Sequence, residues 1–214
     1  IFLGPNGEAP NTAIYQSLQE GISANSAVHV TATTPVVVYA HIIRSARSGA
    51  SLILPTAVWG KEYLVPSYRS SGSSGANSGY GIINVVAKEP NTIVEITPTA
   101  PSRTGLPAGV PYTVTLSQPG DVYQVQYQQN ADISGTLVKS IASGGTGCKP
   151  IAVFSATTWS AFDCTGASGG DNLYQQLFPT RSFGKNFLTA PFFQKQYDIF
   201  RVFVTDPNTV VKRT

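Results

Sequence analysis

The feature that most constrains this chain is an internal duplication. The segment from Leu54 to Leu64 returns as the segment from Phe178 to Leu188, an offset of 124 positions. Shorter segments return in the same order at offsets of 111 to 117, among them Pro35 to Ala40 and Pro90 to Val94. An ordered series of matches indicates tandem units. We predict two repeats of about 115 residues, over approximately 22–130 and 133–214, the second incomplete.

The repeats are predicted to consist of short strands. The chain is 42% hydrophobic and only 12% charged, with 20 Gly, 15 Pro and no Met, which is typical of an all-β protein. Turn signals such as Pro90-Asn91 and Gln118-Pro119-Gly120-Asp121 separate alternating apolar runs. Eight strands are predicted, at 81–87, 92–97, 112–116, 122–127, 136–141, 151–156, 173–178 and 186–190.

The arrangement of these strands has two interpretations. Tandem four-stranded antiparallel units of about 50 residues suit a β-propeller. Paired β-sandwich lobes use strands of the same length, and we favour the propeller-like arrangement only narrowly over them. Residues 13–18 resemble the last strand of a unit and residues 200–213 the first two, so the two ends could complete one sheet or each belong to a neighbour. We expect one module of a longer polypeptide.

Several function classes are disfavoured by the sequence. The formal net charge is +3 and the basic residues are scattered, so we predict no nucleic-acid partner. The longest apolar run, which ends at His41, is too short to span a bilayer, so we predict no membrane insertion. No Gly-x-Ser-x-Gly sequence lies at a predicted strand-to-helix turn, where a nucleophile elbow would be, and the 11 acidic residues are thinly spread. We predict no enzyme activity, no cofactor and no metal site, with a carbohydrate hydrolase as the minor alternative.

The duplicated segment pairs an aromatic residue with a glycine in both copies. Such a pair could form a ligand platform, or the aromatic could fill a core while the glycine permits a bulge or a positive φ. Recurrence in both units favours the structural interpretation, because a ligand site rarely duplicates with its whole scaffold. The predicted structural motif comprises Pro55, Trp59, Gly60, Pro179, Phe183 and Gly184.

The two cysteines, Cys148 and Cys164, lie sixteen positions apart. A disulfide between them would suit a secreted protein, and two unrelated thiols are the alternative. We predict the disulfide.

Three long loops are the predicted places for recognition, at 68–80, 100–109 and 162–171. Tyr and Arg are frequent anchors in binding sites, so Arg69, Tyr80 and Arg103 are the candidate ligand-binding residues. The alternative is that all three loops are spacers without a partner.

Four segments carry a resemblance to a known family, at 54–63, 132–136, 149–155 and 175–180. Together they resemble the N-terminal domain of the IgG Fc-binding protein family, whose members occur in secreted mucus-type and bacterial surface proteins. The chain departs from the family in having Phe183 where Trp is usual, and Cys148 is peculiar to this chain.

The resemblance implies a secreted or cell-surface, non-enzymatic binding or adhesion module for a protein or glycoprotein. It does not imply that this copy binds IgG. The alternative function is a structural subunit of an extracellular assembly or filament, held by homotypic strand addition.

Overall fold

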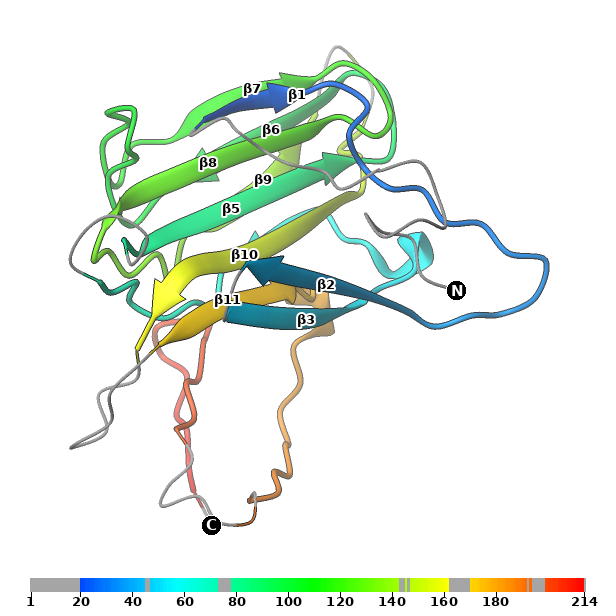
Figure 1. Cartoon of the computed structure of the whole chain (residues 1–214). Helices are drawn as coiled ribbons and strands as arrows, with labels where there is room; N and C mark the ends of the chain where they lie inside the picture. The colour runs from blue at the N-terminus through cyan, green and yellow to red at the C-terminus, as the bar shows by residue number, and fades with distance from the viewer. Residues whose placement is uncertain are drawn as a thin grey trace.

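The computed structural model describes residues 20–44, 47–72, 78–142, 145, 147–161, 170–191, 193 and 199–213 (Figure 1). Within these ranges the regular elements are antiparallel strands and short 3-10 turns, with no α-helix. The all-β expectation is confirmed.

The larger sheet has five strands in the order β1-β8-β5-β10-β11. Along β5, which is rich in Ile and Val, buried and half-buried residues alternate strictly, because successive side chains point to opposite faces of the sheet. One face of this sheet is therefore committed to a core. The strands are β1 (Glu20–Ser23), β8 (Val122–Gln129), β5 (Tyr80–Ala87), β10 (Ile151–Ser160) and β11 (Asp171–Gln176).

The second sheet has four strands in the order β4-β9-β6-β7: β4 (Glu62–Leu64), β9 (Leu137–Ile141), β6 (Thr92–Thr97) and β7 (Tyr112–Leu116). The predicted turns join it to the first sheet. Asn91 adopts a φ of 52° between β5 and β6, and Gly120 a φ of 83° between β7 and β8. Both residue types tolerate this left-handed conformation, so the chain can cross between sheets at these points.

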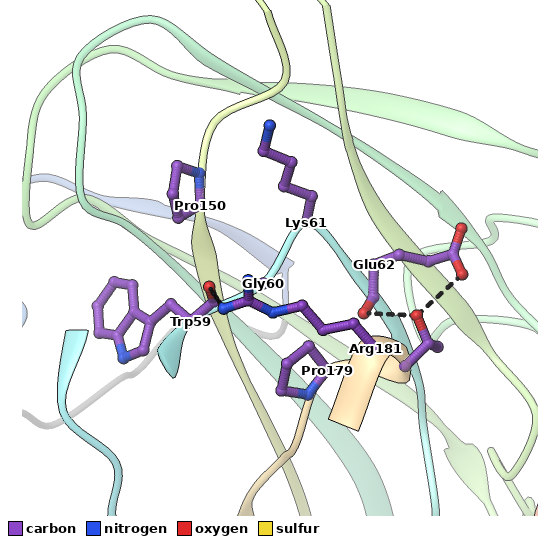
Figure 2. Close-up of a pocket in the computed structure, with 8 residues that line it drawn as sticks. Trp59, Gly60, Lys61, Glu62, Pro150, Pro179 and Arg181 are labelled. Atoms are coloured by element: carbon purple, nitrogen blue, oxygen red, sulfur yellow. Dashed lines mark hydrogen bonds between the residues drawn. The ribbon is translucent and has the colours of Figure 1, made fainter. Parts of the chain in front are cut away.

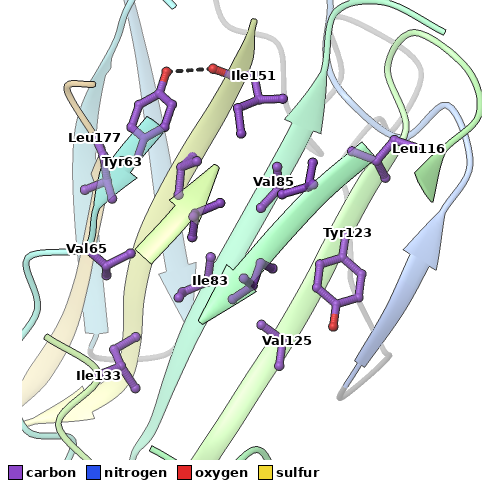
Figure 3. Packing of buried hydrophobic residues seen from close by; sticks show 14 of the residues in the cluster. Tyr63, Val65, Ile83, Val85, Leu116, Tyr123, Val125, Ile133, Ile151 and Leu177 are labelled. Carbon is purple, nitrogen blue, oxygen red and sulfur yellow. Dashed lines mark hydrogen bonds between the residues drawn. The ribbon is translucent and has the colours of Figure 1, made fainter. Parts of the chain in front are cut away.

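The two sheets share one core (Figure 3). Ile83, Val85 and Val125 of the five-stranded sheet are fully buried, and so are Val94 and Ile96 of the four-stranded sheet. Because a single cluster draws on both sheets, the sheets face one another across it. Its further members include Tyr63, Val65, Leu116, Tyr123, Ile133, Val138, Ile151 and Leu177.

A hairpin of β2 (Val38–Arg44) and β3 (Arg47–Ile53) lies beside this body, with β3 next to β11. Side chains join the two strands. The Gln176 Oε1 accepts a 2.7 Å hydrogen bond from the Leu54 N–H, and the Gln176 N–H donates to Ser51 Oγ at 2.8 Å. After β3 the chain passes through η1 (Thr56–Val58) into β4, and after β11 it passes through η3 (Thr180–Ser182).

The pairing of the strands differs from the predicted four-stranded units. Strands β5 to β8 occur almost at the predicted residues, but β5 pairs with β8 in one sheet while β6 pairs with β7 in the other. No sheet of four consecutive strands, the hallmark of a propeller blade, is found in the described part of the chain. The reason is burial: splitting the unit lets the apolar faces of β5 and β6 share a core, whereas one flat sheet would leave an apolar face uncovered.

Two further strand predictions are wrong, and one falls outside the structure. Residues 186–190 and 200–213 form no strand. In Figure 1 the orange part of the chain runs away from the sheets, and the red part returns to their edge before it reaches the C-terminus. Most of the large apolar side chains in these two ranges are exposed, Leu188 completely so, and Phe203 is half-buried. The predicted strand at 13–18 lies outside the described residues.

Candidate functional site

Two of the three long loops predicted for recognition, 68–80 and 162–171, are anchored at one end of the five-stranded sheet, and residues 73–77 and 162–169 within them lie outside the described residues. The third loop, 100–109, joins β6 and β7 of the four-stranded sheet.

At that end of the five-stranded sheet the first residue of β5, Tyr80, pairs with the last residue of β8, Gln129. Ser160 ends β10 and pairs with Asp171, which begins β11. Antiparallel pairing thus brings the segments before β5, after β10 and before β11 to the same edge.

The first loop is fixed to the end of β10 by its backbone. The Ser71 N–H donates to the Trp159 carbonyl at 3.0 Å, and the Ala161 N–H donates to Ser71 Oγ at 2.7 Å. Ser160 Oγ donates to the Arg69 carbonyl at 2.9 Å. These hydrogen bonds fix the backbone at Arg69, and the Arg69 residue is exposed.

The second loop joins the first through Arg103. Its guanidinium carbon lies 4.0 Å from the centre of the Tyr80 ring, a cation–π arrangement. Its Nη1 donates to Gln126 Oε1 at 2.7 Å, and its backbone N–H donates to the Gln126 carbonyl at 2.9 Å. Two residues chosen separately from the sequence thus form one half-buried pair, held in place by β8.

One member of the site was not found by sequence reasoning. The Glu20 carboxylate in β1 accepts hydrogen bonds from Ser102 Oγ and Thr104 Oγ1, on either side of Arg103. Strand β1 reaches this loop because it pairs with the outer edge of β8. Nothing in the local sequence around Glu20 signals this contact, which depends on strand order.

The duplicated motif forms a second feature, at the pocket in Figure 2. Both copies fold alike: each Pro precedes a 3-10 turn, and each aromatic ends it with extended backbone. The copies also contact one another. Arg181 Nη2 donates to the Trp59 carbonyl at 2.8 Å, and Thr180 Oγ1 donates to Glu62 Oε1 at 3.1 Å.

These contacts correct the reason given for the glycines and aromatics. Gly60 is needed for space, since a Cβ there would lie 2.2 Å from Pro179 Cβ, and not for a positive φ. Trp59 is half-buried and Phe183 is 41% exposed, so neither fills the main core. The structural interpretation of the motif gains support from its internal hydrogen bonds. Pro55 is exposed and Gly184 packs against Phe187.

A cluster of tyrosines joins β7 and β8. The Tyr112 and Tyr123 rings meet edge to face with centroids 6.4 Å apart, and their hydroxyls are 3.3 Å apart. Burial raises the pKa of Tyr112, Tyr123 and Tyr127 well above the ordinary value of 10.0. These hydroxyls stay neutral at physiological pH, which suits a structural role.

The predicted disulfide falls partly outside the structure. Cys148 is half-buried just before β10, and no disulfide is seen at it within the described part of the chain. Cys164 lies outside the described residues, so the pairing stays a prediction.

Among the residues that the structure describes, no group of three or more His, Cys, Asp or Glu side chains could hold a metal ion. No helix within the same ranges is long and apolar enough to cross a bilayer. On the contacts described above, the candidate site is the loop-bearing end of the sheet, with Arg69, Tyr80, Arg103 and Glu20 as its chemically distinctive side chains.

Comparison of the chain with known protein families gives a match. The family model described as IgGFc binding protein matches residues 49–214. The chain belongs to this family. The matched region of this IgGFc-binding family member runs from β3 to the last residue, and it contains both copies of the duplicated motif and the Tyr80–Arg103 pair. No curated protein and no solved structure matches.

Proposed function

We propose that this chain is an extracellular, non-enzymatic module that binds a protein or glycoprotein ligand. The observation that carries the proposal is the family match over residues 49–214, since the family is described as binding the Fc part of an immunoglobulin. We further propose that its fold is a β-sandwich lobe, which is supported by two facing sheets with one core.

The loop-bearing end of the five-stranded sheet is the proposed recognition surface. Among the described residues, Arg103 and the backbone at Arg69 are held by hydrogen bonds to β8 and β10, so they occupy fixed positions at low entropic cost. Arg103 is oriented by Tyr80 and Gln126, while Arg69 is exposed. A guanidinium group held against an aromatic ring, with a second arginine on another loop of the same surface, suits acidic or carbonyl groups on a protein or sialylated glycoprotein surface.

A binding array tests this proposal. The purified chain is applied to a protein and glycan array that includes the IgG Fc fragment, with the Fab fragment as its control. The R69A/R103A variant is then measured against each ligand found, and we expect an affinity at least about tenfold weaker, the loss typical of one anchor residue.

The matched control is K61A/K88A, which removes the same charge from residues outside these loops and is expected to bind normally. Equal affinity of R69A/R103A and the wild type would exclude this surface. An array without any protein or glycoprotein ligand would contradict the proposed function itself.

The second candidate function is a structural subunit of an extracellular assembly. The observation that favours it is the set of exposed large apolar side chains in the terminal segments, such as Val37 at 71%, Phe187 at 76% and Val210 at 78%. Size-exclusion chromatography with light scattering decides it: a concentration-dependent increase in mass is expected for assembly, and a monomer at every concentration contradicts it.

A further inference from the structure

The exposed apolar surface of this protein is confined to two segments. Apart from Val110, every large apolar side chain that is exposed in the described ranges belongs to residues 22–58 or 178–211. Residues between these segments bury theirs in the central core, which runs from Tyr63 to Leu177. So much apolar surface is not left in water without a reason, and the two segments need an apolar partner.

The C-terminal segment repeats the sequence of core strands. Aligned through Pro90 and Pro207, an offset of 117, residues 199–204 correspond to 82–87 of β5. Ile83, Val85 and Ala87 are at most 1% exposed in the core, whereas their counterparts Phe200, Val202 and Val204 are 61%, 63% and 38% exposed. The segment has the alternation of a core strand and lacks a sheet.

The N-terminal hairpin offers the matching edge. Aligned through Pro35 and Pro150, an offset of 115, β2 corresponds to β10, which is the neighbour of β5 in the central sheet. Val153 of β10 pairs with Val85 of β5, and their counterparts are Val38 and Val202. Among the described strands β2 pairs only with β3, so its other edge has room for a strand.

The arrangement of the two copies brings these partners to the same side. Strand β3 lies beside its own counterpart β11, and near-equivalent residues are level: the Ser48 N–H donates to Asp171 Oδ1 at 3.1 Å, and the Leu54 N–H to Gln176 Oε1. The duplicated turns η1 and η3 also touch. Equivalent elements that pack on each other with a shift of only one or two residues along the chain are consistent with an approximate two-fold relation.

A two-fold operation applied twice returns to the starting position. The two-fold operation relates the β2–β3 hairpin to its counterpart β10–β11 in the central core. Applied again to the segment that follows β11, the same operation places that C-terminal segment beside the β2–β3 hairpin. We propose that residues 199–204 add to the free edge of β2 in the same chain, as β5 adds to β10. The two ends of the chain would then build a second core, with Val38 opposite Val202, Tyr39 opposite Arg201 and Ala40 opposite Phe200.

In the present arrangement the segment lies elsewhere. Arg201 Nη2 bonds to Asp132 Oδ2 at 3.0 Å and Nη1 bonds to Ser134 Oγ at 3.0 Å. Ile199 and the half-buried Phe203 line a pocket with Tyr68 and Tyr174, while Phe200, Val202 and Val204 stay exposed. The Arg201 contacts are on the surface and contribute little free energy, so they do not prevent the segment from moving to β2.

Disulfide trapping tests the proposed register. Val38→Cys and Val202→Cys are introduced together into the full chain with Cys148 and Cys164 replaced by Ser, and the protein is oxidised mildly. Opposed residues in antiparallel strands have Cα atoms about 4.5–5.5 Å apart, within reach of a disulfide. We expect a crosslinked monomer in at least about tenfold excess over the control pair V38C/F203C, in which a one-residue slip points the side chains to opposite faces.

Each outcome decides the proposal. A crosslinked monomer specific to V38C/V202C supports it. A crosslinked dimer means that a second copy supplies the strand, and equal or absent crosslinking means that the strand is not at β2; both overturn it. Hydrogen exchange of the unmodified protein gives an independent measurement: we expect amides in 200–204 to exchange about 100-fold slower than an unstructured peptide, and unprotected amides contradict the proposal.

Discussion

The Tyr63 hydroxyl makes two buried hydrogen bonds to backbone groups in the central core. Tyr63 is 1% exposed, and its oxygen accepts a 2.8 Å hydrogen bond from the Gly60 N–H while donating a 2.6 Å hydrogen bond to the Ile151 carbonyl. Tyr63→Phe keeps the ring and leaves both backbone groups without this partner. Since an unsatisfied buried group costs about 1–3 kcal/mol, we expect the free energy of unfolding to fall by about 2–4 kcal/mol.

Urea unfolding followed by tryptophan fluorescence measures this loss, and thermal unfolding should show a decrease of about 2–4 °C in Tm for each kcal/mol. Tyr123→Phe is the matched control, because it also removes one tyrosine hydroxyl, whose distance to the Tyr112 hydroxyl is a long 3.3 Å. We expect the control to lose less than about 1 kcal/mol. If Tyr63→Phe loses no more than the control, the double hydrogen bond does not stabilise the fold as argued.

Three other predictions concern the same fold. Gly60→Ala should cost about 1–3 kcal/mol by thermal unfolding, because its Cβ would lie 2.2 Å from Pro179 Cβ, whereas Gly147→Ala, with open space around it, should be neutral. Burial raises the pKa of Tyr63 above 10.0, so its contribution should be complete below pH 10 and fall at higher pH, as denaturation from pH 8 to 12 would show. Partial burial raises the pKa of Asp132, but hydrogen bonds from Ser134 and Arg201 outweigh it and hold that pKa below 3.8. The stabilisation by the Asp132 carboxylate should therefore be present above about pH 4 and be lost on acidification. D132N should remove this acid dependence of the free energy of unfolding.

The strands were predictable from the sequence because their signal is local. Alternation in 81–87 and 92–97 gave β5 and β6 to within one residue, and Pro90-Asn91 gave the turn between them. The assignment of β5 and β6 to different sheets was not predictable from the sequence. It depends on which apolar faces pack together in the core, and these faces come from strands far apart in the sequence. The wrong strand at 186–190 shows the same limit: it copies the sequence of β4 but has no paired neighbour here.

The candidate site was predictable only in part, for a similar reason. Residue type pointed to Arg69, Tyr80 and Arg103 one at a time. Their relation depends on strand β8, which carries Gln126 beneath Arg103 and pairs with the start of β5 at Tyr80. Glu20 has no local signal at all, since only the pairing of β1 with β8 brings its carboxylate to the loop.

The duplication explains why the boundaries of the unit were harder to find than its length. A repeating sequence fixes the period, but it does not fix where one unit begins, because every starting point gives the same offsets. The starting point is set by which strands bury their faces together. In this chain the core begins at Tyr63 and ends at Leu177, so it crosses the junction predicted near residue 130. The segments on either side then follow as the two parts of another unit, which is why their apolar residues are the ones left exposed.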